Sequence, residues 1–398
     1  MFMYTAWPLF ICFNAGYLLL LMTNFQTYIG SFLASKLLII ITITPPLIVI
    51  LKRQLAVSPV ICVPDANMVK AKHAVVTVFF TLLLLYTHLM ARFGISPFAS
   101  FTFEFTLLYP ILVLLAPWYL RFTSSRLAEP EDEYAKLGYS LLRRRKFILH
   151  EHKALILKSL VKLLFIPIMA GALFDTTEFL LTFSWSAKPL VIITGIFTFG
   201  LAFDLIVATI GYVFSSKLLN SDVKSTDPNI SGWLVCLICY PPLLIIYHWI
   251  KQQTDNYLWY DWLTADHPLY WFWAFMITAT WMTYWISSAN FGWKFSNLTW
   301  RGLIDTGPYA YTKHPAYIAK NIYWWMHTVP FFGVTTTYEF IRNIAGLLFV
   351  STVYYLRAKT EERHLMAFAE YRAYSEQIAK NGIFSRIKRR LFKRQVEA

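Results

Sequence analysis

The sequence has few charged residues, few cysteines and no glycine-rich nucleotide loop. Charged residues occupy 15% of its 398 positions, against about 25% in an average soluble domain. The four cysteines, Cys12, Cys62, Cys236 and Cys239, provide no disulfide framework. Neither G-x-G-x-x-G nor G-x-S-x-G occurs. A soluble-type nucleotide domain and a serine hydrolase therefore have no support.

Apolar residues are abundant instead. Hydrophobic residues make up 57% of the chain and aromatic residues 18%, and the mean hydropathy is +0.48. A helix that crosses a membrane needs about 20 mainly apolar residues. The sequence therefore predicts an all-α, polytopic integral membrane protein with about ten transmembrane helices. The candidate spans lie near residues 4–23, 32–51, 73–91, 101–121, 155–174, 188–214, 230–250, 267–287, 316–334 and 338–356.

Lysine and arginine are distributed unevenly between the loops on the two sides of these spans. If the N-terminus is cytoplasmic, the cytoplasmic segments contain 28 of the 36 Lys and Arg residues. The opposite loops contain only Arg92, Lys188 and Lys251. Cytoplasmic loops of membrane proteins carry such an excess. We therefore predict that both termini, and the C-terminal motifs described below, are cytoplasmic.

The net charge of +14 comes mostly from this bias and from the basic end of the chain. Basic residues next to membrane spans attract anionic lipid headgroups. We therefore predict that anionic lipid headgroups are partners of this protein and that nucleic acid is not. Residues 143–146 read RRRK and act either as a simple cytoplasmic anchor or as a headgroup site for an anionic lipid. Residues 376–398 are predicted to form a basic, amphipathic tail on the membrane surface.

A helix break followed by a helix start occupies residues 307–317, which read GPYAYTKHPAY. Gly307 and Pro308 interrupt any helix, whereas Pro315 has the fixed φ that suits a first helical turn. His314 and Tyr317 should then lie at a helix N-terminus at the membrane surface. The unpaired N–H groups and the dipole of such a terminus favour an anion or a polar ligand.

A second motif, Arg357-x-x-x-Glu361-Glu362-x-x-Leu365, follows two apolar segments later. On a helix, Arg357 and Glu361 lie one turn apart on the same face. An arginine binds a carboxylate or phosphate with two parallel hydrogen bonds, and a glutamate accepts hydrogen bonds from hydroxyl or amino groups. One side of this helix could hold an anionic substrate and the other a polar cofactor.

At these two motifs the chain resembles the isoprenylcysteine carboxyl methyltransferase family and its relatives among the phospholipid methyltransferases. That family pairs a Gly-x-Tyr and Arg-His-Pro-x-Tyr segment with a downstream Arg-x-x-x-Glu-Glu-x-x-Leu helix. The resemblance covers roughly residues 288 to 375. Lys313 stands where the family usually has arginine, and the aromatic positions after Leu365 are spaced more closely than in the family.

The resemblance implies that the protein binds S-adenosyl-L-methionine between the two motifs and transfers its methyl group. It implies cofactor binding by Glu361 and by a pocket that includes the residues Tyr309, His314, Pro315 and Tyr317. It further implies that the segment from Arg301 to Ile304, with Leu303 and Ile304 at its end, contributes to the cofactor pocket largely through its backbone.

Methyl transfer from a sulfonium is an in-line displacement, so the site mainly has to hold two molecules in line. An acceptor carboxylate or phosphate needs no general base, and Arg357 would orient it. An amine or alcohol needs a base, for which His314 and Glu362 are the candidates. The sequence thus predicts methyl transfer to a membrane lipid or lipidated substrate, with a carboxylate or phosphate acceptor favoured and Arg357 as the substrate-binding residue.

Two other functions remain open. Membrane NADPH-dependent reductases of the sterol-reductase kind have similar spans and C-terminal motifs. A non-catalytic lipid-binding or transport protein would explain the long region before the motifs. Asp204, near the middle of a span, either pairs with a basic group or lines a lipid-substrate cavity. We predict no metal site, because His150-x-His152 has no partner ligands nearby.

These inferences divide the chain into three parts. Residues 1–287 form an N-terminal transmembrane region of about eight spans, which we expect to shape the access of a lipid substrate. Residues 288–375 form a methyltransferase-like catalytic module with a helical hairpin. Residues 376–398 form the basic tail.

Overall fold

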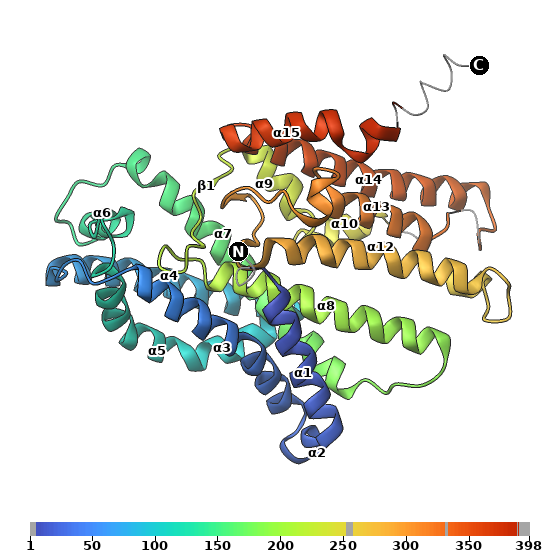
Figure 1. Cartoon of the computed structure of the whole chain (residues 1–398), viewed down its shortest axis with the longest axis horizontal. Helices are drawn as coiled ribbons and strands as arrows, with labels where there is room; N and C mark the ends of the chain where they lie inside the picture. Colours follow the sequence, from blue (N-terminus) through green and yellow to red (C-terminus); the bar gives the residue numbers. More distant parts are fainter. Residues whose placement is uncertain (1–4, 252–257, 331–332, 388, 390–398) are drawn as a thin grey trace. The chain divides into compact units, whose positions relative to one another are not determined.

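The computed structural model describes residues 5–251, 258–330, 333–387 and 389. Nearly all regular structure in these residues is helical, so the predicted all-α fold is confirmed (Figure 1). Of the predicted basic tail, residue 388 and residues 390–398 lie outside the described residues, as do parts of the predicted spans at 4–23 and 316–334.

The chain forms two compact units that interleave along the sequence. One unit contains residues 1–182, 205–226 and 292–301, and the other contains residues 183–204, 227–291 and 302–398. We call them the first and the second unit. The division predicted at residue 287 stays a prediction.

The first unit contains most of the long apolar helices. Its helices are α1 (Trp7–Thr23), α2 (Phe25–Ile29), α3 (Ser31–Val57), α4 (Ala66–Arg92), α5 (Ser96–Ser124), α6 (Glu133–Leu141) and α7 (Leu149–Thr182). It also contains two short strands that pair antiparallel, β1 (Ser225–Thr226) and β2 (Thr299–Trp300). Helix α4 packs on α5 and α6, and α7 packs on α3 and α5. Helix α8 (Pro189–Val213) contributes its first part to the second unit and its last part to the first.

The second unit carries both sequence motifs. Its further helices are α9 (Ile230–Leu237), α10 (Leu244–Lys251), α11 (Trp259–Trp262), α12 (Tyr270–Phe291), α13 (Pro315–His327), α14 (Thr337–Leu365) and α15 (Ala369–Asn381). Helix α13 packs between α12 and α14, while α9 and α10 pack on α14 (Figure 1). Pro241 and Pro242 also predict a helix break inside the apolar segment near 230–250. The structure confirms this break, because α9 ends at Leu237 and α10 begins at Leu244.

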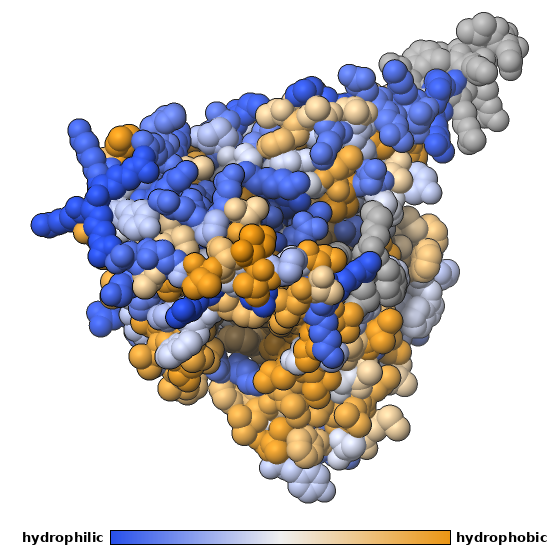
Figure 2. Space-filling view, turned by 60° about the vertical axis from the view of Figure 1, so that its left-hand side comes forward, coloured by the Kyte–Doolittle hydropathy of each residue, from blue (hydrophilic) through white to orange (hydrophobic). Residues whose placement is uncertain are grey.

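Five helices of the described chain are long and apolar enough to cross a membrane. They are α3, α4, α5, α7 and α8. The first four each contain one of the ten predicted spans, and α8 lies within the span predicted near 188–214. Large apolar side chains such as Leu107, Leu114 and Trp118 lie exposed along α5, and Figure 2 shows hydrophobic side chains gathered over a broad area of the surface. These features are those of an α-helical membrane protein.

The count of ten spans is not confirmed. Helix α1 is apolar but has 17 residues, and α13 has 13. The segment near 230–250 is divided between two helices of eight residues each. Hydropathy alone identified these segments as spans because it registers apolar content and not helix continuity.

Two lysines inside the long helices of the first unit form ion pairs. Lys36 of α3 and Glu104 of α5 form an ion pair at 3.0 Å. Lys72 of α4 is buried, and its Nζ lies 3.2 Å from Asp132 Oδ1 and 2.9 Å from the Ser124 hydroxyl. Because an unpaired charge at such positions is costly, these pairs stabilise the helix packing.

Arg301 is a buried structural residue of the same unit, with 4% of its side chain exposed. Its guanidinium donates hydrogen bonds to the main-chain carbonyls of Gly211 at 2.7 Å, Trp293 at 2.9 Å and Phe295 at 2.9 Å, and to that of Ser221. The carbonyl of Gly211 is among the last of α8, where a helix leaves acceptors unpaired and favours a cation. Arg301 thus joins the end of α8 to the segments around β2.

Candidate functional site

The first motif folds as its glycine and prolines predict. Gly307 has a φ of 59°, in the left-handed region that favours glycine, and begins a short 3₁₀ turn over Gly307–Ala310. Helix α13 then begins at Pro315, with His314 at the N-cap position. Tyr317 lies in its first turn, so the predicted location of His314 and Tyr317 at a helix N-terminus is confirmed.

The second motif lies at the end of α14. A capping box of Thr336 and Glu339 fixes the start of this helix, which is uninterrupted through Leu365. Arg357 and Glu361 are therefore one turn apart on a helix, as the spacing predicted, and Glu362 follows on the neighbouring face.

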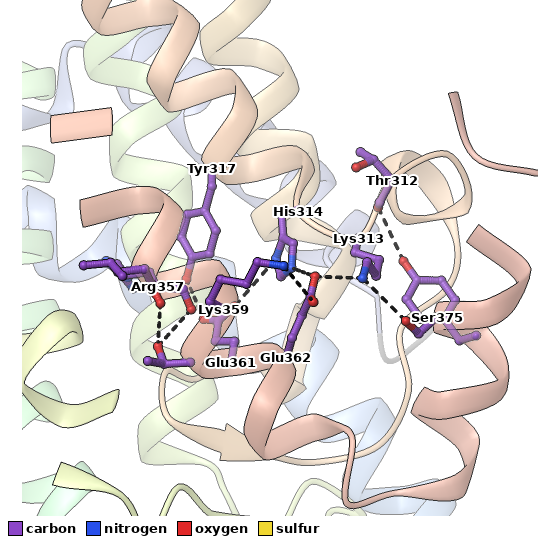
Figure 3. A network of polar contacts seen from close by, with 12 residues as sticks. Thr312, Lys313, His314, Tyr317, Arg357, Lys359, Glu361, Glu362 and Ser375 are labelled. Carbon is purple, nitrogen blue, oxygen red and sulfur yellow. Dashed lines mark hydrogen bonds and ion pairs between the residues drawn. The ribbon is translucent and has the colours of Figure 1, made fainter. Parts of the chain in front are cut away.

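Figure 3 shows that the two motifs meet through their side chains. Glu362 Oε1 lies 2.9 Å from His314 Nε2 and 2.8 Å from Lys313 Nζ. These two basic partners lower the pKa of Glu362 to about 2. Because an ionised carboxylate only accepts hydrogen bonds, Nε2 of His314 carries the proton of this contact. A carboxyl group with so low a pKa is a poor base, so Glu362 orients the imidazole.

Glu361 makes a separate contact with the first motif. The Tyr317 hydroxyl donates a hydrogen bond of 2.5 Å to Glu361 Oε1, and Glu361 Oε2 lies 3.9 Å from His314 Nδ1. The rings of His314 and Tyr317 are stacked with centroids 5.8 Å apart. A carboxylate, a phenol and an imidazole nitrogen therefore converge on one point, which provides acceptors for the hydroxyl and amino groups of a ligand.

Arg357 lies beside this point and is 5% exposed. Its guanidinium carbon is 5.2 Å from the ring centroid of Tyr317 and 5.7 Å from that of Tyr240. The Tyr317 ring in turn stacks on Tyr354 at 6.0 Å. The arginine is thus a desolvated cation between aromatic faces, in surroundings that strengthen its attraction to an anion.

Tyr309 and Pro315 are both buried in this region. The Tyr309 ring packs edge-on against Phe291 at 5.2 Å, and its main-chain carbonyl accepts a hydrogen bond of 2.7 Å from the Tyr374 hydroxyl of α15. Burial, together with the nearby Glu361 carboxylate, raises the pKa of Tyr309 well above its usual value. The phenol therefore stays neutral, and the hydrogen bond from Tyr374 ties the 3₁₀ turn to α15.

Leu303 and Ile304 lie half-buried in the irregular segment before this turn. Their role in a cofactor pocket stays a prediction. Arg301 of the same predicted segment belongs to the first unit and serves the structural role described above.

Three residues of the site were not identified from the sequence. Lys313 was considered only as a substitute for arginine, yet it forms the 2.8 Å ion pair with Glu362. Tyr240 and Tyr354 flank Arg357 and Tyr317 from outside both motifs. The position of Tyr240 directly before Pro241-Pro242 was the available signal, because a helix break inside an apolar segment often lines a site.

The fold and the site define an α-helical membrane protein with an acidic and aromatic site at the meeting point of α13 and α14. No protein-family model, curated protein or solved structure matches the chain.

Proposed function

We propose that the protein is a membrane methyltransferase that uses S-adenosyl-L-methionine to methylate a lipid or lipidated acceptor at the cytoplasmic face of the membrane. The acceptor group that fits the site best is a carboxylate or a phosphate. The two motifs carry the resemblance to isoprenylcysteine carboxyl methyltransferases and phospholipid methyltransferases.

The observation that supports this proposal is the direct contact between the motifs. His314 and Tyr317 hydrogen-bond Glu362 and Glu361 across more than 40 residues of chain, with Arg357 one turn away on α14. If the first motif were only a helix cap and the second only a local ion pair, nothing would require their side chains to be in contact. A bisubstrate site requires such convergence, because the donor and acceptor have to be held in line.

In this proposal Glu361 and Tyr317 form the cofactor side. Glu361 accepts hydrogen bonds from the amino or hydroxyl groups of S-adenosyl-L-methionine. The Tyr317 face attracts the sulfonium by a cation–π contact worth about 0.5–2 kcal/mol. Tyr309, Pro315, Leu303 and Ile304 enclose the remaining surface of the cofactor.

Arg357 forms the acceptor side. Its partly desolvated guanidinium binds the acceptor carboxylate or phosphate and reduces the repulsion between this anion and Glu361. Such an acceptor is already a nucleophile. With an alcohol or amine acceptor, His314 would be the base, because Glu362 already holds its Nε2 proton and leaves Nδ1 to accept another.

Calorimetric titration of the detergent-solubilised protein with S-adenosylhomocysteine and, separately, with NADPH tests the proposal. We expect binding of S-adenosylhomocysteine alone. Binding of NADPH alone would assign the protein to the sterol-reductase kind of enzyme. Binding of neither would favour a lipid-binding or transport protein.

A further inference from the structure

A second polar cluster in the second unit consists of residues other than those of the proposed methyl-transfer site. Asp204 of α8 is 7% exposed, although the surrounding helix is almost entirely apolar. The Tyr284 hydroxyl of α12 donates a hydrogen bond of 2.6 Å to Asp204 Oδ2. The Lys320 Nζ of α13 lies 4.0 Å from the centroid of the Tyr284 ring. Three helices thus place an acid, a phenol and an amine together.

Close packing brings these side chains into contact. Gly200 lies one turn before Asp204 on α8, and a Cβ atom there would come within 2.3 Å of the Trp285 ring of α12. Only glycine lets the two helices approach so closely. The aromatic rings of Phe197, Trp281 and Tyr323 pack next to this contact and form an apolar wall around the cluster.

The cluster does not satisfy its own hydrogen bonds. The Ser288 hydroxyl is a hydrogen-bonding neighbour of the Asp204 carboxyl group, and the Lys320 ammonium attracts this group by its charge. Within the described residues, however, no donor completes a hydrogen bond to Asp204 Oδ1, which is fully buried. A buried acceptor without a partner destabilises the folded state. The acceptor without a partner distinguishes the cluster from the pair of Lys72 and Asp132, in which the ammonium contacts the carboxylate directly.

We infer that Asp204, Tyr284 and Lys320 form a binding site for an uncharged, membrane-soluble lipid that carries a hydroxyl group. The hydroxyl donates its hydrogen to Asp204 Oδ1 and accepts a hydrogen bond from Lys320 Nζ. The hydrocarbon part lies against the aromatic wall. Tyr284 and Lys320 are both partly exposed.

The charges of the site explain why the ligand is uncharged. Ionised Asp204 and Lys320 carry opposite charges and attract each other. An anionic headgroup would face the Asp204 carboxylate, and a cationic one would face the Lys320 ammonium, each in an apolar environment where repulsion is strong. An alcohol offers one donor and one acceptor without charge. This binding does not depend on the proposed methyl transfer.

The test uses photolabelling of the full-length, detergent-solubilised protein without cofactor. The probe is a C16 alcohol that carries a diazirine and an alkyne in its chain. The competitors are hexadecan-1-ol, its methyl ether, hexadecanoate and hexadecylammonium. We expect labelled peptides from α8, α12 and α13, and competition by the alcohol about tenfold stronger than by the ether, which has no donor for Asp204. Equal competition by alcohol and ether, or labelling elsewhere, would refute the inference.

Charge-changing variants separate a ligand site from an ion cluster that only supports the fold. Asp204→Asn leaves Lys320 uncompensated, so hexadecanoate should become the best competitor. Lys320→Met leaves Asp204 uncompensated, so hexadecylammonium should become the best one. Glu104→Gln, which changes a paired acid in a long helix of the first unit, is the control and should leave the order unchanged.

A merely structural cluster would lower the unfolding temperature of these variants without changing the order of competitors, and this result would overturn the inference. If a variant fails to fold, the comparison of alcohol and ether on the unaltered protein still decides.

Discussion

Arg301 and Arg357 are both buried arginines, but their surroundings differ. Arg301 directs its guanidinium at four main-chain carbonyls and makes the end of α8 and the β2 region one structure. Arg357 lies against the faces of Tyr240 and Tyr317, next to the acid pair of α14. A buried charge surrounded by backbone acceptors stabilises a fold. Arg357 lies beside side chains that themselves converge, and we propose that it binds a ligand.

The largest effect that we expect is the loss of folding stability when the Arg301 side chain is removed. Arg301→Ala leaves four carbonyls without their donor, three of which lie 2.7–2.9 Å from the guanidinium in the native protein. We expect a loss of about 3 kcal/mol or more in the free energy of unfolding. Thermal unfolding of the solubilised protein, followed by circular dichroism, measures it. Arg301→Lys, with a compact ammonium that reaches fewer carbonyls, should fall in between. An unchanged unfolding temperature in Arg301→Ala would show that Arg301 does not stabilise the fold.

Arg357→Ala should have the opposite pattern. If Arg357 binds the acceptor, methyl incorporation from labelled S-adenosyl-L-methionine into membrane lipid should fall about 100-fold, since a charged hydrogen-bonded contact is worth about 1.5–3 kcal/mol. The affinity for S-adenosylhomocysteine should stay within about threefold, and the loss of stability should be smaller than for Arg301→Ala. Arg357→Lys keeps the charge without the fork and should recover part of the activity. If Arg357→Ala lost as much stability as Arg301→Ala, both arginines would be structural residues, and the distinction between them would be wrong.

Glu361→Gln sharpens the distinction between the two sides of the site. Because Glu361 is expected to accept hydrogen bonds from the cofactor as an anion, its amide should weaken S-adenosylhomocysteine binding by at least about tenfold. Calorimetry measures this change. The matched control is Glu376→Gln, an exposed acid on α15, for which no change is expected. Full cofactor affinity in Glu361→Gln would place the cofactor elsewhere.

The smallest effect concerns Glu362 and acid. His314 and Lys313 lower its pKa to about 2 in the folded protein, below its usual value of 4.5. The stability from these contacts is therefore fully present above pH 4.5 and is lost as the pH falls toward 2. Unfolding temperatures measured from pH 7 to pH 2 should fall more steeply below pH 4.5 for the unaltered protein than for Glu362→Gln. Parallel curves would show that the contacts contribute nothing to stability.

The sequence was informative wherever a local rule applied. Gly307, Pro308 and Pro315 predicted the 3₁₀ turn and the start of α13, because glycine and proline restrict the backbone by themselves. Pro241 and Pro242 predicted the break between α9 and α10 for the same reason. The spacing of Arg357 and Glu361 placed them on one helix face.

Local rules failed where continuity or partners mattered. Hydropathy counted segment 230–250 as one span although its helix is interrupted. The sequence alone also left Asp204 between a structural pair and a cavity residue, because nothing near it in the chain is charged. Its neighbours Tyr284 and Lys320 come from helices 80 and 116 residues further along.

The sequence by itself determined that this is an apolar, all-α chain with a helix start at Pro315 and an acidic helix end at Glu361 and Glu362, because composition and backbone restriction act locally. Only the tertiary structure decided that His314 contacts Glu362, that Tyr317 contacts Glu361, and that Arg301 and Arg357 have different surroundings. These facts depend on which distant groups meet. The energy of a buried charge is set by the neighbours that packing brings to it.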